Sequence, residues 1–386
     1  MPSSTPDLPH PPHVPESAGP ARPARLPRLA ELPQLSRPSR LPQLPRLPSD
    51  EDLVEALLAL AVPFEEVNGL LAARTRLDRD RGLRTFFEEM LHEQAEAVGT
   101  LGRPSGLDRD WAAGTAGGEG LATLLFVALA PLARAHHRAL GIPPEVTAST
   151  LADLGRQLAV SRWRGRAGLG NARWLTLHFR GELFHLGRLQ FQRTRVTGAD
   201  SSAALAGGAP VARAADASAA LGGDADEWSL QLHIPDHCGP LSPAACDRAL
   251  DRARVFFPRH FPGEPYRSCH IFSWLLDPQL ADHLPAESNI IRFQRRFSPL
   301  ERPDRPSVPE DTNPLKFVFG DIERPLESLP RDTVVQRALV DHLRAGGHWY
   351  VRGGRLPLRK VVPSTPSTAL PTVGAGTGSM NADPME

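Results

Sequence analysis

The amino-acid sequence predicts an α+β protein, in which an all-helical N-terminal domain is followed by a mixed β-sheet domain with flanking helices. Between about residues 50 and 165, apolar residues recur at the three- and four-residue spacing of an amphipathic helix. Beyond that point, several short segments alternate apolar and polar residues, which is the period of a strand with two different faces. A block of helices followed by a block of strands is typical of the α+β class.

Five helices are expected in the N-terminal domain. The first begins after Ser49, a favourable N-cap residue, and carries Asp50, Glu51 and Asp52 in its first turn, where the helix macrodipole favours negative charge. Prolines and glycines separate the helices, which are expected at residues 50 to 61, 64 to 76, 83 to 98, 119 to 140 and 144 to 160.

The sheet domain is organised around residues 228 to 261, which predict a strand, a short loop and a helix. Apolar Trp228, Leu230, Leu232 and Ile234 alternate with Ser229, Gln231 and His233, and Pro235 ends the strand. Ser242 is a favourable N-cap and Pro243 a natural first helical residue. Because a helix start presents free backbone N–H groups, this loop is a candidate seat for a phosphate or pyrophosphate.

Other elements are expected on both sides of this unit. A hairpin is predicted in which residues 174 to 179 pair, across Arg180 and Gly181, with residues 183 to 191. Asp332 is expected to cap a helix that ends at Gly346. Further strands are expected at residues 268 to 276, 288 to 297 and 315 to 319, and a last hairpin at 348 to 351 and 355 to 358 around Gly353 and Gly354.

Composition excludes several classes of function. The 386 residues contain 44 Lys+Arg and 44 Asp+Glu, so the chain has no net basic charge to attract nucleic acid or an anionic membrane. No apolar run approaches the roughly 20 residues of a membrane span. Three cysteines are too few for a disulfide framework, which fits a reducing compartment. A cytoplasmic protein is therefore expected.

The predicted domain limits follow from shifts in composition. Residues 1 to 48 are rich in proline and arginine and predict a disordered tail, with a proline-rich docking segment as the alternative. The helical domain is expected at 49 to 165 and the sheet domain at 166 to 358. A flexible insertion is expected at 198 to 224, and a second disordered tail at 359 to 386.

The order of elements and several phrases of the sequence point to one family. The phrases are GIPPEVTASTLADLGRQL from residue 141, ARWLTLHFRGELFHLGRLQFQ from 172, LHIPDHCGPLSP from 232, SCHIFSWLLDPQLADHLPAESNIIRFQRRF from 268 and LPRDTVVQRALVDHLRAGGHW from 329. In them the chain resembles the GNAT superfamily. More narrowly, it resembles two-domain proteins that pair a helical N-acyltransferase N-terminal domain with a GNAT-like C-terminal domain, over roughly residues 50 to 358.

The resemblance implies a place for acyl-CoA or acetyl-CoA as co-substrate. In the superfamily, acyl-CoA lies where two central strands separate, and its pyrophosphate contacts backbone N–H groups at the start of the central helix. The resemblance puts His233 and Ile234 beside the acyl group. It puts the pyrophosphate at Cys238, Gly239, Pro240, Leu241 and Ser242. This loop has one glycine followed by proline, so it departs from the superfamily's usual glycine-containing pattern.

Acyl transfer to an amine requires a base, and an acid for the leaving thiolate. His233 is the first candidate base, because imidazole titrates near neutral pH and the residue ends the central strand. Asp277 is an alternative base, although Asp-Pro also begins helices well. The superfamily often supplies its acid from a tyrosine on the last helix, and residues 333 to 345 contain none. Tyr266 and Tyr350 are the only tyrosines, and either could reach inward. Tyr266 is the candidate acid, with loop anchoring as the alternative role of both.

The sequence favours thiol chemistry and metal binding less. Cys238 lies near a helix start, which lowers a thiol pKa, but no base is evident beside it. No pair among His233, His237, Cys238, Cys269 and His270 has the spacing of a zinc site, so no metal is expected.

The function expected from the resemblance is direct transfer of an acyl group from acyl-CoA to an amine acceptor. A non-catalytic acyl-CoA-binding or regulatory module is the alternative, and a helical interaction protein is a third possibility. The acyl chain, the acceptor and the oligomeric state stay open.

Overall fold

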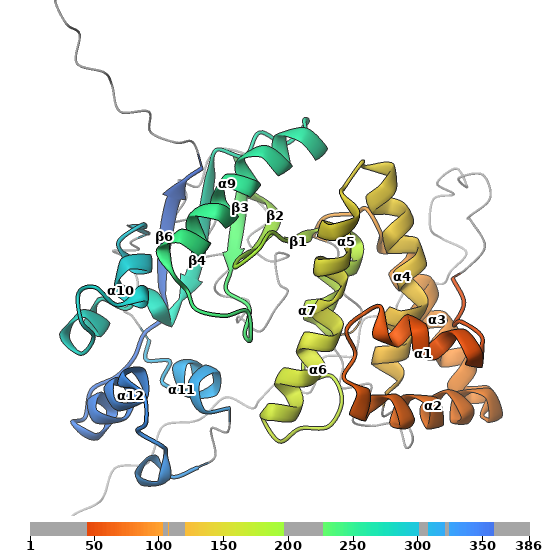
Figure 1. Ribbon diagram of the computed structural model, residues 1–386, viewed down its shortest axis with the longest axis horizontal. Helices are drawn as coiled ribbons and strands as arrows, with labels where there is room; N and C mark the ends of the chain where they lie inside the picture. Colours follow the sequence, from red (N-terminus) through yellow and green to blue (C-terminus); the bar gives the residue numbers. More distant parts are fainter. Residues whose placement is uncertain are drawn as a thin grey trace, which may run out of the picture. The chain divides into compact units, whose positions relative to one another are not determined.

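A computed structural model describes residues 45–102, 107, 120–196, 227–300, 308–320 and 324–358. The insertion expected at 198–224 and the tail expected at 359–386 lie outside these residues, as does the first tail except for residues 45–48. The predicted α+β class is confirmed, since a helical region precedes a mixed sheet with helices (Figure 1). None of the described helices is long and apolar enough to cross a membrane.

Seven helices make up the N-terminal region in the described residues. They are α1 (Asp50–Leu58), α2 (Phe64–Arg79), α3 (Arg81–Ala97), α4 (Leu121–Ala139), α5 (Pro144–Leu151), α6 (Asp153–Trp163) and α7 (Ala172–Arg180). The cap predicted at Ser49 is present, because its side chain accepts a hydrogen bond from the Asp52 N–H. The single helix predicted at 144 to 160 is two helices that meet at Ala152.

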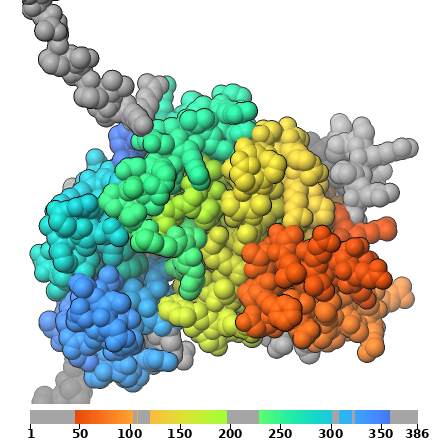
Figure 2. Space-filling model, viewed as in Figure 1, coloured from red at the N-terminus to blue at the C-terminus, as the bar shows by residue number. Residues whose placement is uncertain are grey.

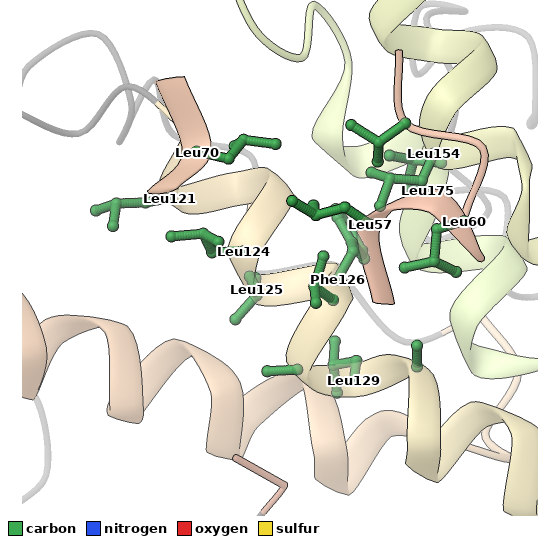
Figure 3. Packing of buried hydrophobic residues seen from close by; sticks show 14 of the residues in the cluster. Leu57, Leu60, Leu70, Leu121, Leu124, Leu125, Phe126, Leu129, Leu154 and Leu175 are labelled. Atoms are coloured by element: carbon green, nitrogen blue, oxygen red, sulfur yellow. The ribbon is translucent and has the colours of Figure 1, made fainter. Parts of the chain in front are cut away.

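The core of this region surrounds α4, which is buried on every side from Leu121 to Ala130. In Figure 3, Leu57 of α1, Leu154 of α6 and Leu175 of α7 gather near Phe126 of α4, and all four are fully buried. Burying each such side chain contributes about 1.5–3 kcal/mol. Both α6 and α7 are therefore held by the helical core.

One glycine allows α6 to approach the end of α1. A Cβ atom at Gly155 would lie 1.8 Å from the carbonyl oxygen of Ala61, so no larger residue fits without a backbone shift. The Gly155 N–H also donates to the Leu60 carbonyl at 3.2 Å. This close approach fixes the start of α6, which carries Asp153.

The sheet has six strands in the order β1-β2-β3-β4-β6-β5. The strands are β1 (Leu183–His185), β2 (Gln190–Val196), β3 (Glu227–His233), β4 (Ser268–Ser273), β5 (Ser298–Leu300) and β6 (Arg352–Pro357). Every neighbouring pair is antiparallel except β3 and β4, which are parallel. The central unit predicted from residue 228 is confirmed as β3 followed by α9 (Pro243–His260), with Ser242 as N-cap.

The two faces of the sheet differ in chemistry. Phe184, Phe191 and Leu232 are in register across β1, β2 and β3, and they belong to the apolar cluster that includes α9. On the opposite face His185, Gln190 and His233 are in register across the same three strands. The alternation of the sequence thus separates a packing face from a polar face.

Several predicted strands and hairpins are wrong. Residues 174 to 179 lie in α7, which is capped by Asn171 and ends at Gly181 with φ +77°, and the hairpin is formed instead by β1 and β2. Residues 288 to 297 form α10 (Asn289–Gln294), capped by Ser288. Residues 315 to 319 lie in α11 (Thr312–Phe319). Alternation of apolar and polar residues over a segment as short as these also suits a short helix that is buried on more than one side.

The last predicted hairpin is one strand, β6. A Cβ atom at Gly353 would lie 2.9 Å from the Phe272 ring, and one at Gly354 would lie 2.6 Å from Leu276, so these glycines allow close packing rather than a turn. The strand predicted at 268 to 276 ends at Ser273 and continues as the 3₁₀ turns η1 (Trp274–Leu276) and η2 (Pro278–Asp282). The helix α12 (Val334–Arg344) begins at Thr333 rather than Asp332, because Thr333 and Gln336 form a capping box.

Candidate functional site

The centre of the sheet opens at the C-terminal ends of β3 and β4. The two strands pair over three residues, Ser229 with Ser268, Leu230 with Cys269 and Gln231 with His270. Beyond these pairs β3 continues to His233 and β4 to Ser273, without pairing with each other. The strand edges that face this opening carry backbone N–H and C=O groups that can pair with an extended ligand.

His233 lies at this opening, on the polar face of β3. Its Nε2 is 3.0 Å from Oε1 of Gln192, a residue of β2. An amide oxygen only accepts, so Nε2 carries the proton and Nδ1 presents its lone pair. No described residue forms a hydrogen bond to Nδ1, and the side chain is half-buried. Neutral His233 therefore has a free acceptor atom.

Burial is the main reason that the pKa of His233 falls to about 3, and nearby His270 and His178 lower it further. The ring of Trp174 from α7 meets the His233 ring edge-on, with centroids 4.7 Å apart. The imidazole is thus neutral at pH 7 and held between β2 and α7.

A buried polar network lies behind Trp174. The carboxylate of Asp153 is fully buried and accepts hydrogen bonds from Trp174 Nε1 at 3.0 Å and from Gln190 Nε2 at 2.9 Å. His178 Nε2 lies 3.2 Å from the same carboxylate, and Arg156 is in contact with it. Because Gln190 is the cross-strand partner of His233, the network connects α6 and α7 to the polar face of the sheet.

The loop from β3 to α9 contains the predicted pyrophosphate seat. Ser242 Oγ accepts from the Ala245 N–H at 3.4 Å. Gly239 has φ +75°, which favours glycine. Within the described residues, the N–H groups of Gly239, Leu241 and Ser242 donate to no other group. The loop therefore offers donors next to a helix start, although Pro240 supplies none.

Three arginines surround this loop. Arg164 pairs with Asp236 at 3.0 Å. Arg188 Nη1 donates to the Pro235 carbonyl at 3.2 Å, while its buried Nε meets no partner in the described residues. Arg296 Nη2 donates to the Pro243 carbonyl at 3.2 Å. Figure 2 shows the green loop beside the yellow-green end of α6, consistent with the Arg164–Asp236 pair. Guanidinium groups and helix N-termini both suit phosphate.

The structure does not bring Tyr266 to this end of the sheet. Its ring packs on Trp228, with centroids 5.7 Å apart, and its hydroxyl contacts Glu264. Trp228 is near the start of β3, about 17 Å along the strand from His233. Burial raises the pKa of Tyr266.

Asp277 is buried, and its carboxylate accepts hydrogen bonds from backbone N–H groups. Its carboxylate accepts from the Gln279 N–H at 3.1 Å and from the Tyr350 N–H at 2.8 Å. These bonds cap η2 and fix the segment before β6, so both oxygens of Asp277 have partners.

The cysteines differ in exposure. Cys246 and Cys269 are buried, and burial raises the pKa of Cys269 to about 12. Cys238 is half-buried in the loop. Across the part of the chain that the structure describes, no group of three or more His, Cys, Asp or Glu residues could hold a metal ion.

A pocket of about 510 Å³ adjoins the opening. Its lining includes Ile234 and Leu241 of the loop and Trp274 of η1. Its lining also includes Leu284, Val318 of α11 and Val335 of α12.

The site residues predicted from the sequence as His233, Ile234 and 238 to 242 lie together at one end of β3, and their roles stay predictions. The sequence prediction missed Gln192, Asp153, Trp174 and Gln190. In the sequence Asp153 resembles any acidic residue of a helix, and the alternation around Trp174 predicts a strand. Only the register of β2 with β3 brings Gln190 and Gln192 to the site.

Two family models match the described regions of the chain. Residues 51–181 match the family model of an N-acyltransferase N-terminal domain, and residues 183–356 match that of a GNAT-like C-terminal domain. No curated protein matches the chain. The domain boundary predicted at residue 165 stays a prediction.

Solved acyltransferase structures are similar to the chain over most of its length. One, in complex with decanoyl-CoA and teicoplanin, has 34% identity and a TM-score of 0.68, over 82% of this chain and 90% of that chain. A mutant acyltransferase with octanoyl-CoA has 34% identity and a TM-score of 0.69, over 81% and 90%. A third, with CoA and 10C-teicoplanin, has 33% identity and a TM-score of 0.68, over 81% and 90%.

Proposed function

The chain belongs to the two-domain family that joins an N-acyltransferase N-terminal domain to a GNAT-like C-terminal domain, and from this premise we propose that it transfers an acyl group from acyl-CoA directly to an amine. The observation that carries the proposal is the separation of β3 and β4 beside His233. The complexes of the solved relatives with CoA, octanoyl-CoA and decanoyl-CoA support acyl-CoA as the co-substrate.

In this proposal the pyrophosphate of CoA binds at Cys238, Gly239, Pro240, Leu241 and Ser242. The free N–H groups of the loop and the positive end of α9 support this position. Arg188, whose buried Nε has no hydrogen-bond partner among the described residues, supplies positive charge nearby. The amides of the pantetheine arm pair with the edge of β3 beyond Gln231, which places the thioester near His233 and Ile234.

His233 is the proposed base. As the amine attacks the thioester carbon, its proton moves to Nδ1 of His233, and the tetrahedral intermediate then releases the CoA thiolate. A pKa of about 3 makes the imidazole a weak base at rest. Negative charge developing on the thioester oxygen raises that pKa during the reaction. A thiol of pKa near 8.5 leaves readily, so the distance of Tyr266 from the site is no obstacle.

Gln192 is the proposed positioning residue for this base. Its amide oxygen holds the proton on Nε2 at 3.0 Å, which keeps Nδ1 as the acceptor. The acceptor amine approaches from the polar face, where Trp174 lies against His233. Two of the solved relatives are in complex with teicoplanin or 10C-teicoplanin, so teicoplanin belongs in the acceptor panel for the present chain.

Two measurements test the proposal. A thermal-shift experiment with CoA and acyl-CoA detects binding, because a ligand that binds only the folded state at 100 times its Kd adds about 2.7 kcal/mol of stability. Release of free CoA with a panel of amines, including teicoplanin, then detects transfer. Binding without release by any amine would favour the non-catalytic module, and the absence of any shift would exclude both functions.

His233→Ala is expected to lower kcat by about 10²- to 10⁴-fold while CoA still binds. His92→Ala is the matched control, because the side chain of His92 is 44% exposed on α3 and its ion-pair partner among the described residues is Glu96. Equal activity of the two variants would remove His233 from the mechanism.

A further inference from the structure

A second histidine, His270 of β4, lies where the two central strands separate. It is the last residue of β4 that pairs with β3, and its partner there is Gln231. Paired residues of neighbouring strands project on the same side of a sheet, so His270 shares the polar face with His233. Strands lie about 4.8 Å apart and rise about 3.3 Å per residue, so the Cα atoms of the two histidines are about 8 Å apart. A thioester between the two imidazoles is therefore within reach of both.

One ring nitrogen of His270 is held by the sheet, and the other is available to a ligand. Its Nδ1 lies 2.8 Å from the hydroxyl oxygen of Ser229 on β3. The same hydroxyl is 3.2 Å from the Ser268 carbonyl oxygen, and the shorter contact assigns its one proton to Nδ1. The imidazole proton is then on Nε2. His270 is 2% exposed, and among the described residues no group forms a hydrogen bond to Nε2.

The surroundings of His270 favour negative charge on such a ligand. Burial, and then the charge of Arg355, lowers the pKa of His270 to about 4, so the imidazole is neutral at pH 7. A neutral imidazole of lowered pKa is an effective donor to a reacting carbonyl group. Arg355 is the partner of His270 on β6, and its positive charge also stabilises an oxyanion at this position.

We infer that His270 donates a hydrogen bond from Nε2 to the carbonyl oxygen of the thioester and stabilises the oxyanion of the tetrahedral intermediate. The inference rests on the proposed function, since it adds a catalytic residue for the same thioester. When the amine nitrogen bonds to the carbonyl carbon, the electron pair of the C=O bond moves to the oxygen, and the amine proton moves to Nδ1 of His233. The pair then restores the C=O bond, and the C–S bond breaks to release the thiolate. His270 keeps its proton throughout.

Two substitutions separate the roles of the two nitrogens of His270. Asparagine places its amide near the position of Nδ1 and supplies no donor at Nε2, whereas the longer glutamine places an N–H group near Nε2. His270→Asn is expected to lower kcat by about 10²- to 10³-fold while acyl-CoA still binds, and His270→Gln to recover at least about tenfold of that loss. His92→Asn is the matched control, because the side chain of His92 is 44% exposed on α3.

An infrared measurement on the bound acyl-CoA needs no acceptor. The probes are acetyl-CoA and octanoyl-CoA with ¹³C at the carbonyl carbon, bound to the full-length protein. A hydrogen bond to the oxygen weakens the C=O bond, so the carbonyl band is expected to move to lower frequency on binding. This shift is expected to be lost in His270→Asn and kept in His270→Gln and His92→Asn. A residue that only supports the sheet would change stability without changing this band.

The outcomes separate the two proposals. If neither acyl-CoA binds, the proposed function fails. If the bound carbonyl band does not move in the unsubstituted protein, or if His270→Asn matches His92→Asn in band position and kcat, His270 is not the donor, while the proposed function stands. Ser229→Ala protects the test against misfolding of the His270 variants, because it keeps the imidazole and removes the partner of Nδ1. The inference requires a smaller band shift in Ser229→Ala, and an unchanged shift overturns it.

Discussion

Replacing Gln192 with glutamate tests the proposed role of the His233 imidazole. The substitution keeps the length of the side chain and puts a carboxylate where the amide oxygen now lies, 3.0 Å from Nε2. An opposite charge within 4–6 Å raises a histidine pKa by about 1–3 units, which corresponds to about 1.4–4 kcal/mol. Starting from about 3, the pKa of His233 is expected to rise to between about 4 and 6.

The new carboxylate would itself be desolvated, because Gln192 is only 8% exposed. The two groups then titrate together, and the apparent pKa values belong to the pair. In kinetics, the acidic limb of kcat/KM moves upward by about 1–3 pH units, since protonated His233 cannot accept the proton of the amine. Release of CoA measured by chromatography from about pH 4 to 8 covers the position expected for the variant, whereas the wild-type limb lies below this window.

Gln231→Glu is the control for distance. Gln231 is the cross-strand partner of Gln192 on the same face, but no hydrogen bond joins it to His233 in the described residues. A smaller shift of the acidic limb is expected there. If the acidic limb of the kcat/KM profile does not move in Gln192→Glu, or if it moves equally in both variants, His233 is not the base.

Two further predictions concern stability. Burial lowers the folded-state pKa of five histidines to about 3 or 4, so the unfolded chain binds more protons than the folded chain below pH 6.5. The free energy of unfolding should therefore fall as the pH drops from 6.5 towards 4, by up to about 1.4 kcal/mol per pH unit for each histidine. Burial raises the pKa of Glu182 to about 7, so this residue increases the free energy of unfolding as the pH falls from 7 to 4.5 and offsets one histidine. Urea titrations at several pH values measure the sum, and a free energy of unfolding that does not change with pH would contradict this reasoning. Gly155→Ala should destabilise the folded protein by about 1–3 kcal/mol, because the new methyl group meets the Ala61 carbonyl. Gly69→Ala, where the new methyl group has no atom within 4 Å, should stabilise α2 by about 0.5–1 kcal/mol. Equal urea midpoints for the two alanine variants would be inconsistent with the close approach of α6 to α1.

The unit from β3 to α9 was predictable because its signals are local. The alternation from Trp228, the stop at Pro235 and the cap at Ser242 each act within a few residues. The helix α7 could not be predicted in the same way, because the alternation of its apolar and polar residues suits a strand as well as a buried helix. The decisive signals were the cap residue Asn171 and the terminal Gly181 on either side of it.

The same distinction applies to the site. His233 could be predicted from its position at the end of a strand. Gln192 and Asp153 could not, because their partners are distant in sequence: Gln192 lies 41 residues from His233, and Asp153 lies 37 residues from Gln190. Such pairs depend on strand register and helix packing, which no short pattern records.

The two faces of the sheet also affect how this protein can diverge. Along β2 and β3, Phe191 and Leu232 contact the apolar cluster under α9, while Gln192 and His233 point to the opposite side. Substitutions at Phe191, Leu232 and the positions that alternate with them along each strand alter packing, whereas those at the intervening positions alter the surroundings of the imidazole. A descendant of this chain can therefore acquire a different acceptor through changes at alternate positions of two strands, while the residues that hold the sheet to α9 are inherited unchanged.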